Sequence, residues 1–222
     1  MLRSLCLPIL ALGACAVTAT EVALPPSLAG GETLAIEGVN GGLSGRVRVG
    51  AQEGTFQRTR RETTALGTYE SDVATTRLNL TGPDLARPIE VDCRIERRAV
   101  TSQGVSIPTQ PTAYDCVLSR GGALVVEEKR EVAGPYPFPV RLGRVTLDGT
   151  TLSVRSLHDY AGIEREALEA LGYSFADGDT VVGAVSLLMP PRLTIAPGAD
   201  EGQRAAMIAA SAALAITWEP SL

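Results

Sequence analysis

Between Thr33 and Ile195 the sequence alternates repeatedly between apolar and polar residues. A side-chain period of two is typical of strands with one buried face, and the glycine, proline, asparagine and aspartate residues between the alternating runs are typical of turns. We count about eleven or twelve such runs. The pattern predicts a mainly β domain of antiparallel strands joined by short connections.

One stretch near the end of the chain is apolar on every side. Residues 205–216 read AAMIAASAALAI, and seven of these twelve residues are alanine. A helix of this kind has no polar face for solvent, and it is too short to span a bilayer, which takes about 20 apolar residues. Asp200 and Gln203 have the spacing of a capping box that would start such a helix. We therefore expect a buried helix over residues 203–217.

A helix without a polar face needs an enclosure, and the predicted sheet is the element that can supply one. The alanine side chains are small, so strands can approach the helix backbone closely. Closing the sheet into a barrel would also remove the exposed strand edges that promote aggregation. The predicted fold is therefore an antiparallel, closed, barrel-like sheet that encloses an apolar C-terminal helix.

The clearest predicted hairpin lies in the second half of the chain. Asp148-Gly149 separates two alternating runs and suits a type I′ turn. In that register Val145 lies opposite Leu152.

The segment after this hairpin has a different period. Apolar residues follow helical spacing, and a glycine at position 172 would end the helix. We expect a short amphipathic surface helix over Gly162–Leu171.

Two cysteines lie in segments that can pair as antiparallel strands. If Cys93 stands opposite Cys116, the apolar residues two positions away also meet across the strands on the same face. These further pairs are Ile95 with Tyr114 and Val91 with Leu118. In an oxidising compartment we expect a Cys93–Cys116 disulfide, and the alternative is two reduced, buried thiols.

The start of the chain predicts export. Arg3 precedes an apolar run and then small residues, as in a secretory signal peptide. The sequence Leu12-Gly13-Ala14-Cys15 resembles the lipobox of bacterial lipoproteins, in which cleavage before the cysteine leaves that cysteine acylated. A competing site after Val17-Thr18-Ala19 would instead release a soluble periplasmic protein.

The lipobox resemblance implies a signal peptide over residues 1–14 and lipidation of Cys15. Ala16, where some lipoproteins have aspartate, resembles the arrangement that sends lipoproteins to the outer membrane. We expect residues 15–31 to be a tether and residues 32–222 to form a single β-rich domain that faces the periplasm. The expected partner is membrane lipid, because several acyl chains on one cysteine hold a protein firmly.

Charge and motifs exclude several function classes. The chain has 25 acidic and 20 basic residues and a formal net charge of −5, so it has no general attraction to nucleic acid. We find no Gly-rich phosphate loop, no Cys-x-x-Cys pair and no calcium-loop signature. The sequence therefore predicts no cofactor and no metal ion.

The only histidine, His158, is the one residue that suggests catalysis. Ser153 and Ser156 precede it and Asp159 follows it, and these are the residue types of a serine-histidine-carboxylate triad. The chain has no Gly-x-Ser-x-Gly elbow, and no second histidine completes a metal shell. We interpret His158 as a polar residue at a strand end, with a periplasmic hydrolase as the alternative.

An arginine cluster is a candidate contact surface. Arg58, Arg60 and Arg61 lie in one alternating run, where Arg58 and Arg60 project to the same side. They could contact anionic lipid headgroups or an envelope protein. Interspersed acidic residues such as Glu53 and Glu62 favour a mixed, solvated face.

The second half of the chain resembles a known family. The residues that carry the resemblance are the Asp148-Gly149 hairpin, the step Gly172-Tyr173-Ser174-Phe175, the strand Val181–Val185 and the closing alanine-rich helix. Together, over roughly Tyr114–Ile216, they resemble the tubby C-terminal-like barrel shared with phospholipid scramblases. That resemblance implies a barrel filled by its helix, so that binding would use the outer wall or the loops.

The functional prediction combines the anchor with the lack of a catalytic motif. We expect a lipid-anchored envelope protein with a non-catalytic binding or structural role. The alternatives are a hydrolase that uses His158 and a carrier of an apolar or lipid ligand. The carrier would require the terminal helix to lie outside the sheet and to leave a cavity.

Overall fold

The computed structural model describes residues 21–217 apart from 40, 66–68, 103–104, 111, 133–136 and 165. Cys15 and the predicted signal peptide lie outside the described residues. In chain order the elements are η1 (Pro26–Leu28), β1 (Glu32–Glu37), β2 (Ser44–Val49), β3 (Gln52–Ala65), β4 (Tyr69–Thr81), β5 (Ile89–Ser102), β6 (Val105–Pro108), β7 (Ala113–Leu118), β8 (Gly122–Val132), β9 (Pro137–Leu147), β10 (Thr150–Leu157), β11 (Gly172–Asp177), β12 (Thr180–Ser186), β13 (Arg192–Ile195) and α1 (Glu201–Ile216).

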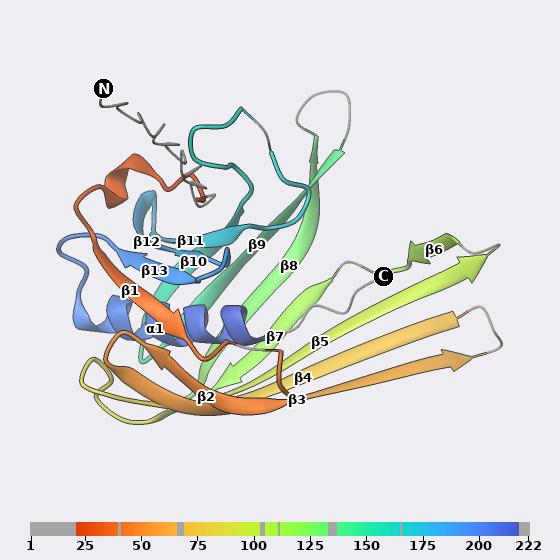
Figure 1. Cartoon of the computed structure of the whole chain (residues 1–222), viewed down its shortest axis with the longest axis horizontal. Helices are drawn as coiled ribbons and strands as arrows, with labels where there is room; N and C mark the ends of the chain where they lie inside the picture. Colours follow the sequence, from red (N-terminus) through yellow and green to blue (C-terminus); the bar gives the residue numbers. More distant parts are fainter. Residues whose placement is uncertain are drawn as a thin grey trace, which may run out of the picture.

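Twelve of the strands close into an antiparallel barrel, as the sequence predicted. Around the ring they follow the order β4-β3-β2-β1-β13-β12-β11-β10-β9-β8-β7-β5, and β5 pairs with β4 to close it. β6 pairs with the far end of β5, outside the ring. Neighbouring strands in the ring are mostly consecutive in the chain, so short turns make most of the connections (Figure 1).

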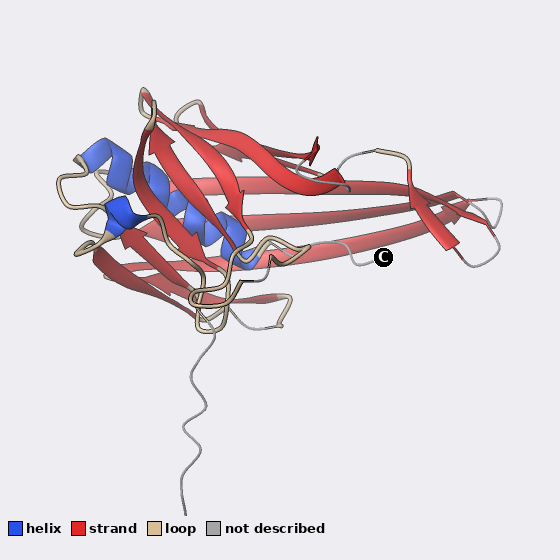
Figure 2. Ribbon diagram, turned by 90° about the horizontal axis from the view of Figure 1, so that it is seen from above, coloured by secondary structure: helices blue, strands red, loops and turns tan. Residues whose placement is uncertain are grey.

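The helix α1 lies inside the barrel, with strands on both sides of it (Figure 2). It contacts strands from all round the ring, namely β2, β4, β5, β9, β10, β12 and β13. Residues Ala206–Ala213 are at most 1% exposed. The predicted capping box is present, because the Asp200 carboxylate accepts a hydrogen bond from the Gln203 backbone N–H at 2.8 Å.

Small residues on both partners allow this close packing. A Cβ atom at position 183 of β12 would lie 2.3 Å from Sδ of Met207 on α1, so the glycine there leaves room for the helix side chain. The alanines of α1 bury only a methyl group each, and larger strand residues such as Leu152 and Phe175 fill the space around them at 0% exposure. The interior is therefore a packed core.

Local predictions about the sheet are confirmed. Val145 pairs with Leu152 across the hairpin, and Asp148 and Gly149 both have positive φ, as a type I′ turn requires. Cys93 pairs directly with Cys116 and forms the predicted disulfide. The flanking residues also meet as predicted: Ile95 with Tyr114, and Val91 with Leu118.

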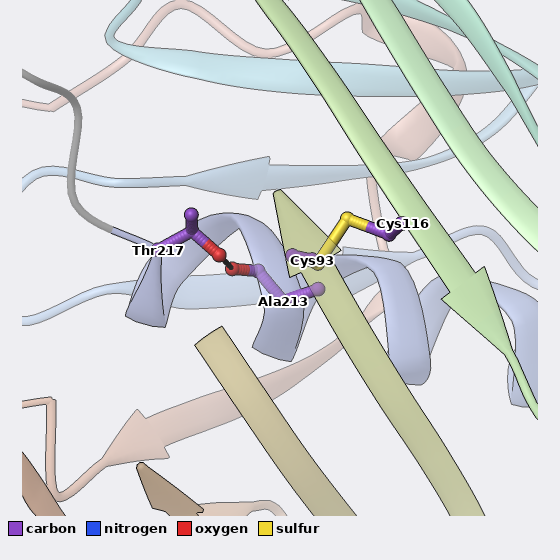
Figure 3. The surroundings of a disulfide bond; sticks show 4 residues. All are labelled: Cys93, Cys116, Ala213 and Thr217. Atoms are coloured by element: carbon purple, nitrogen blue, oxygen red, sulfur yellow. Dashed lines mark hydrogen bonds between the residues drawn. A yellow bond between two sulfur atoms is a disulfide. The ribbon is translucent and has the colours of Figure 1, made fainter. Parts of the chain in front are cut away.

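The disulfide lies beside the C-terminal part of the helix, where Thr217 caps α1 through a 2.6 Å hydrogen bond from its Oγ1 to the Ala213 carbonyl oxygen (Figure 3). Cys93 and Cys116 are each 1% exposed. The cross-link therefore joins β5 and β7 within the core.

The prediction of a surface helix over Gly162–Leu171 is wrong. The described residues of this segment form turns and an isolated bridge between Asp159 and Glu166. Apolar residues have helical spacing there, but Ile163 and Leu168 are 54% and 74% exposed, so they form no buried stripe. The segment is instead held by backbone hydrogen bonds, one of them from Ala167 N–H to the His158 carbonyl oxygen at 2.8 Å.

The second half of the predicted tether packs against the barrel. Val22 forms a bridge with Tyr160 and is 5% exposed, and Leu28 of η1 is 4% exposed. The Ser27 hydroxyl donates to the Val181 carbonyl oxygen at 3.3 Å. Of the predicted tether, only residues 15–20 precede this packed segment.

Three strands are longer than the barrel needs. β2 pairs with β3 only as far as Gln57, and β7 pairs with β5 only as far as Glu96. Beyond these positions β3, β4 and β5 continue together, and β6 joins them on the β5 side. We call this four-stranded extension the arm; it comprises residues 58–65, 69–76, 97–102 and β6, and it projects from the barrel in both views (Figures 1 and 2).

Candidate functional site

A buried polar cluster lies at the end of the barrel where β10 finishes. The Ser156 hydroxyl is 2.7 Å from Nε2 of His158, and its oxygen accepts a 2.8 Å hydrogen bond from the Arg141 backbone N–H. Nδ1 of His158 is 2.8 Å from the carbonyl oxygen of Ala167. A carbonyl oxygen can only accept, so Nδ1 carries the hydrogen and Nε2 is free to accept from Ser156.

This pair reproduces two members of a serine-histidine-carboxylate triad. The third position is taken by the neutral Ala167 carbonyl, which orients the ring but stabilises an imidazolium less well than a carboxylate does. The other two residues that the sequence suggested for a triad are not part of this pair. Asp159 is exposed, and the exposed Ser153 donates to the Ala176 carbonyl oxygen.

Access to the pair is limited. Ser156 is 4% exposed and His158 is 9% exposed, and the ring of Phe138 packs edge-on against the imidazole at 4.8 Å between centroids. The arrangement satisfies buried hydrogen-bonding groups and joins β9, β10 and the segment after β10.

Arg141 extends the cluster into the barrel. Its guanidinium donates to the Tyr173 hydroxyl at 3.0 Å and to the Tyr114 hydroxyl at 3.4 Å, and it lies 5.5 Å from the Tyr114 ring centroid. The Glu128 carboxylate is 4.0 Å away. Because both tyrosines are almost fully buried, their hydroxyl groups need such a partner.

The three arginines predicted as a contact surface have different surroundings. Arg58 is 4% exposed, its guanidinium lies 4.6 Å from the Phe56 ring centroid, and burial lowers its pKa. Arg60 projects from the same face farther along the arm. Arg61 is exposed on the opposite face.

Arg60 belongs to a network of mixed charge. Its Nε lies 2.9 Å from the Asp72 carboxylate, and its guanidinium also contacts Glu62 at 2.7 Å. The hydrogen bond to Asp72 raises the pKa of Arg60. This face of the arm is hollowed, and it is lined by acidic and basic residues together.

The opposite face of the arm carries an apolar stripe at its tip. Tyr69 pairs directly with Val100, which pairs directly with Ile107, so the three side chains lie side by side on β4, β5 and β6. They are 36%, 38% and 57% exposed. We call these three residues the tip stripe.

The arm also has open edges. Within the described part of the chain, residues 59–65 of β3 pair only with β4, and β6 pairs only with β5. A strand edge of this kind presents unpaired backbone N–H and C=O groups to any extended segment that approaches.

Sequence reasoning missed the tip stripe. The signal that could have revealed it is strand length: β3, β4 and β5 have 14, 13 and 14 residues, whereas β1 and β2 have six each. Strands joined in one barrel should match in length, so the excess indicates an extension.

Comparison of the chain with protein-family models, with curated proteins and with solved structures finds no match. The resemblances to bacterial lipoproteins and to the tubby C-terminal-like barrel therefore remain predictions.

Two further searches cover only the residues that the structure describes. They contain no helix long and apolar enough to cross a membrane. They also contain no group of three or more histidine, cysteine, aspartate or glutamate side chains placed to hold a metal ion.

Proposed function

We propose that this protein is a lipid-anchored envelope protein, held through acylated Cys15 and facing the periplasm, that binds a protein partner through its arm. The anchor is supported by the sequence Leu12-Gly13-Ala14-Cys15. The binding role is supported by one observation above all: the arm combines an exposed apolar stripe with open strand edges. Open strand edges promote association, and the β6 edge carries no charged residue that would oppose it.

Strand addition is the binding mode that suits the arm. An extended segment of a partner can pair with β6 or with the free edge of β3 while its apolar side chains contact the tip stripe. The role is non-catalytic. A carrier role has little support, because it requires the helix to lie outside the sheet, whereas α1 fills the barrel.

Site-specific photo-crosslinking in living cells tests this proposal. A photo-reactive amino acid at Ile107 should give a defined adduct with an envelope protein, whereas the same residue at Val117 should not. Val117 is a suitable control because it is 66% exposed but lies on the barrel wall. The adduct should disappear when Val100 is replaced by Asp. Equal adducts from both positions, or none from any tip-stripe position, would contradict the proposal.

A hydrolase remains a second candidate because of one distance, the 2.7 Å between Ser156 Oγ and His158 Nε2. A fluorophosphonate probe separates the two functions, since it labels activated serines. We expect no labelling of the native protein. Labelling that is lost in Ser156→Ala but retained in Ser153→Ala would establish the hydrolase instead.

A further inference from the structure

Large exposed apolar side chains gather in two places on this protein. Nine are found among the described residues, and three of them form the tip stripe. Four others lie on residues 21–24 or on segments that contact those residues: Leu24 at 39%, Ile163 at 54%, Leu168 at 74% and Met189 at 72% exposed. We call these four residues the anchor-side patch.

Backbone contacts hold the segments of this patch together. The Ala161 N–H donates to the Glu21 carbonyl oxygen, and the Ala23 N–H donates to the Asp159 carbonyl oxygen, each at 2.8 Å. These bonds join residues 21–23 to the segment that carries Ile163 and Leu168. Leu24 and Met189 line the same hollow, together with Glu21.

We propose that the anchor-side patch rests in the interfacial layer of the phospholipid leaflet that holds the acylated Cys15. This inference rests on the proposed lipid anchor. Glu21 is only six positions after Cys15, and a fully extended chain of six residue steps spans about 20 Å. The surface around Glu21 must then lie close to the leaflet, and it is the surface that exposes these four apolar side chains.

The charges near the patch define the kind of contact. Segments 21–24, 159–171 and 187–192 contain five acidic residues and only two basic ones, Arg165 and Arg192. Anionic headgroups would repel this surface, so the contact is apolar insertion into a zwitterionic leaflet, as for interfacial segments that bury apolar side chains at the headgroup boundary.

The position of the patch on the barrel gives the domain an orientation. Its segments follow β10 and β12, which lie across the ring from β3, β4 and β5, the strands that form the arm. β3, β4 and β5 extend away from the barrel into the arm (Figure 1), so with the patch on the leaflet the arm leaves from the wall across the ring from β10 and β12. The tip stripe then stays available for a partner in the periplasm.

Fluorescence quenching by lipid measures this contact on the full lipidated protein. A cysteine introduced at Leu168 or Met189 is the only free thiol of the mature chain, since Cys15 is acylated and Cys93 and Cys116 form a disulfide. A fluorophore on this thiol is compared in phosphatidylcholine vesicles with brominated and ordinary acyl chains. The matched controls carry the label at Val117 and at Ile107, which are also exposed apolar positions.

We expect brominated lipid to reduce the emission at positions 168 and 189 by roughly twofold or more and to leave both controls almost unchanged, because the patch inserts only about 5–10 Å. Adding phosphatidylglycerol should not strengthen the quenching. Replacing both Leu168 and Met189 by Glu should abolish quenching of a label at Leu24, while the thermal midpoint stays the same and the acyl chains keep the protein on the vesicles.

Two failures are distinguishable. A protein that sediments with the vesicles but shows equal quenching at patch and control positions overturns the membrane-contact inference alone. A mature protein that carries no acyl chain and does not sediment overturns the proposed anchor, and the inference with it. Quenching that appears only with anionic lipid also overturns the inference, because it would indicate an electrostatic contact.

Discussion

Three long strands, β3, β4 and β5, run from the barrel wall into the arm, and the face that they turn inward differs between the two regions. Within the barrel this face carries Phe56 and Leu78, which are buried in the hydrophobic core. In the arm the same face carries Arg60 and Asp72, which pair with each other at 2.9 Å. The arm is the part of these strands that extends past the end of α1 (Figure 1). Large apolar side chains on this face are therefore replaced by charged ones in the arm.

This difference indicates that the barrel and the arm contribute differently to stability and to binding. Fully burying a Leu or Phe side chain contributes about 1.5–3 kcal/mol, whereas a cross-strand polar pair contributes about 0.2–1 kcal/mol. The barrel therefore provides most of the stability. The arm is not needed to close the barrel, so we expect its exposed features to serve binding.

The largest expected effect follows from breaking the Cys93–Cys116 disulfide, which lies in the barrel. The cysteines are 23 residues apart, and loop-entropy reasoning gives about 3 kcal/mol for a cross-link of this span. Urea unfolding with and without a reducing agent measures the loss. The double variant Cys93→Ala, Cys116→Ala should be insensitive to the reductant. A native protein with the same midpoint in both conditions would show that the barrel does not depend on the bond.

Overpacking the enclosed helix comes next. Ala209 and Ala213 are 0% and 1% exposed, so a leucine at either position should force the strands apart and cost about 1–3 kcal/mol. The exposed Ala51 provides the matched control, and its replacement by Leu should have little effect. Thermal unfolding compares the three variants. Unchanged midpoints for both helix variants would mean that α1 is not enclosed.

One strand allows the two regions to be compared directly. Val91 and Val100 both lie on β5, but Val91 is 2% exposed in the barrel and Val100 is 38% exposed on the arm. Val91→Ser should cost about 2 kcal/mol or more, because it loses apolar contacts and buries a hydroxyl. Val100→Ser should change stability by no more than about 0.5 kcal/mol and should still weaken the photo-crosslink from Ile107. Equal destabilisation would contradict the division between barrel and arm.

The smallest effect concerns charge at the base of the arm. Glu96 accepts hydrogen bonds from Arg98 at 2.6 Å and from Arg94 at 3.1 Å, and these bonds lower its pKa. A lowered pKa in the folded state stabilises the protein above the ordinary pKa of the group, and this contribution is lost as the pH falls through the lowered value. Because the Glu96 side chain is partly exposed to solvent, which screens these interactions, we expect less than about 1 kcal/mol.

An NMR titration of the Glu96 carboxyl carbon measures the pKa directly. Urea unfolding at neutral pH and at about pH 3 should show a smaller pH-dependent loss for Glu96→Gln than for the native protein. A titration of Glu96 at or above the ordinary value would contradict this account of the arm.

Much of the barrel could be predicted because its signals are local or pairwise. The Asp148-Gly149 turn, the Asp200–Gln203 capping box and the alternation around Cys93 and Cys116 each specify their own geometry. The apolar helix then required an enclosure, and a closed sheet was the predicted solution. Each step depended on a few neighbouring residues or on one strand pairing.

The failures come from contacts that no local pattern encodes. The segment after β10 has the apolar spacing of a helix, but it forms turns, and backbone hydrogen bonds that involve Ala23 and Ala161 join its first residues to residues 21–23. The sequence showed only that Ser156 and His158 are two positions apart. The geometry of the pair depends on hydrogen bonds to the Ala167 carbonyl and from the Arg141 backbone N–H, which the sequence does not reveal. The tip stripe depends on the register of three strands at once.

The mass of the intact protein from the membrane fraction of its native host tests the central claim most directly. A mature chain that begins at Cys15, carries added acyl groups and is two hydrogens short for the Cys93–Cys116 bond is the result that the account predicts. A chain that begins at Thr20 and carries no lipid would contradict it, because nothing would then hold the anchor-side patch to a leaflet.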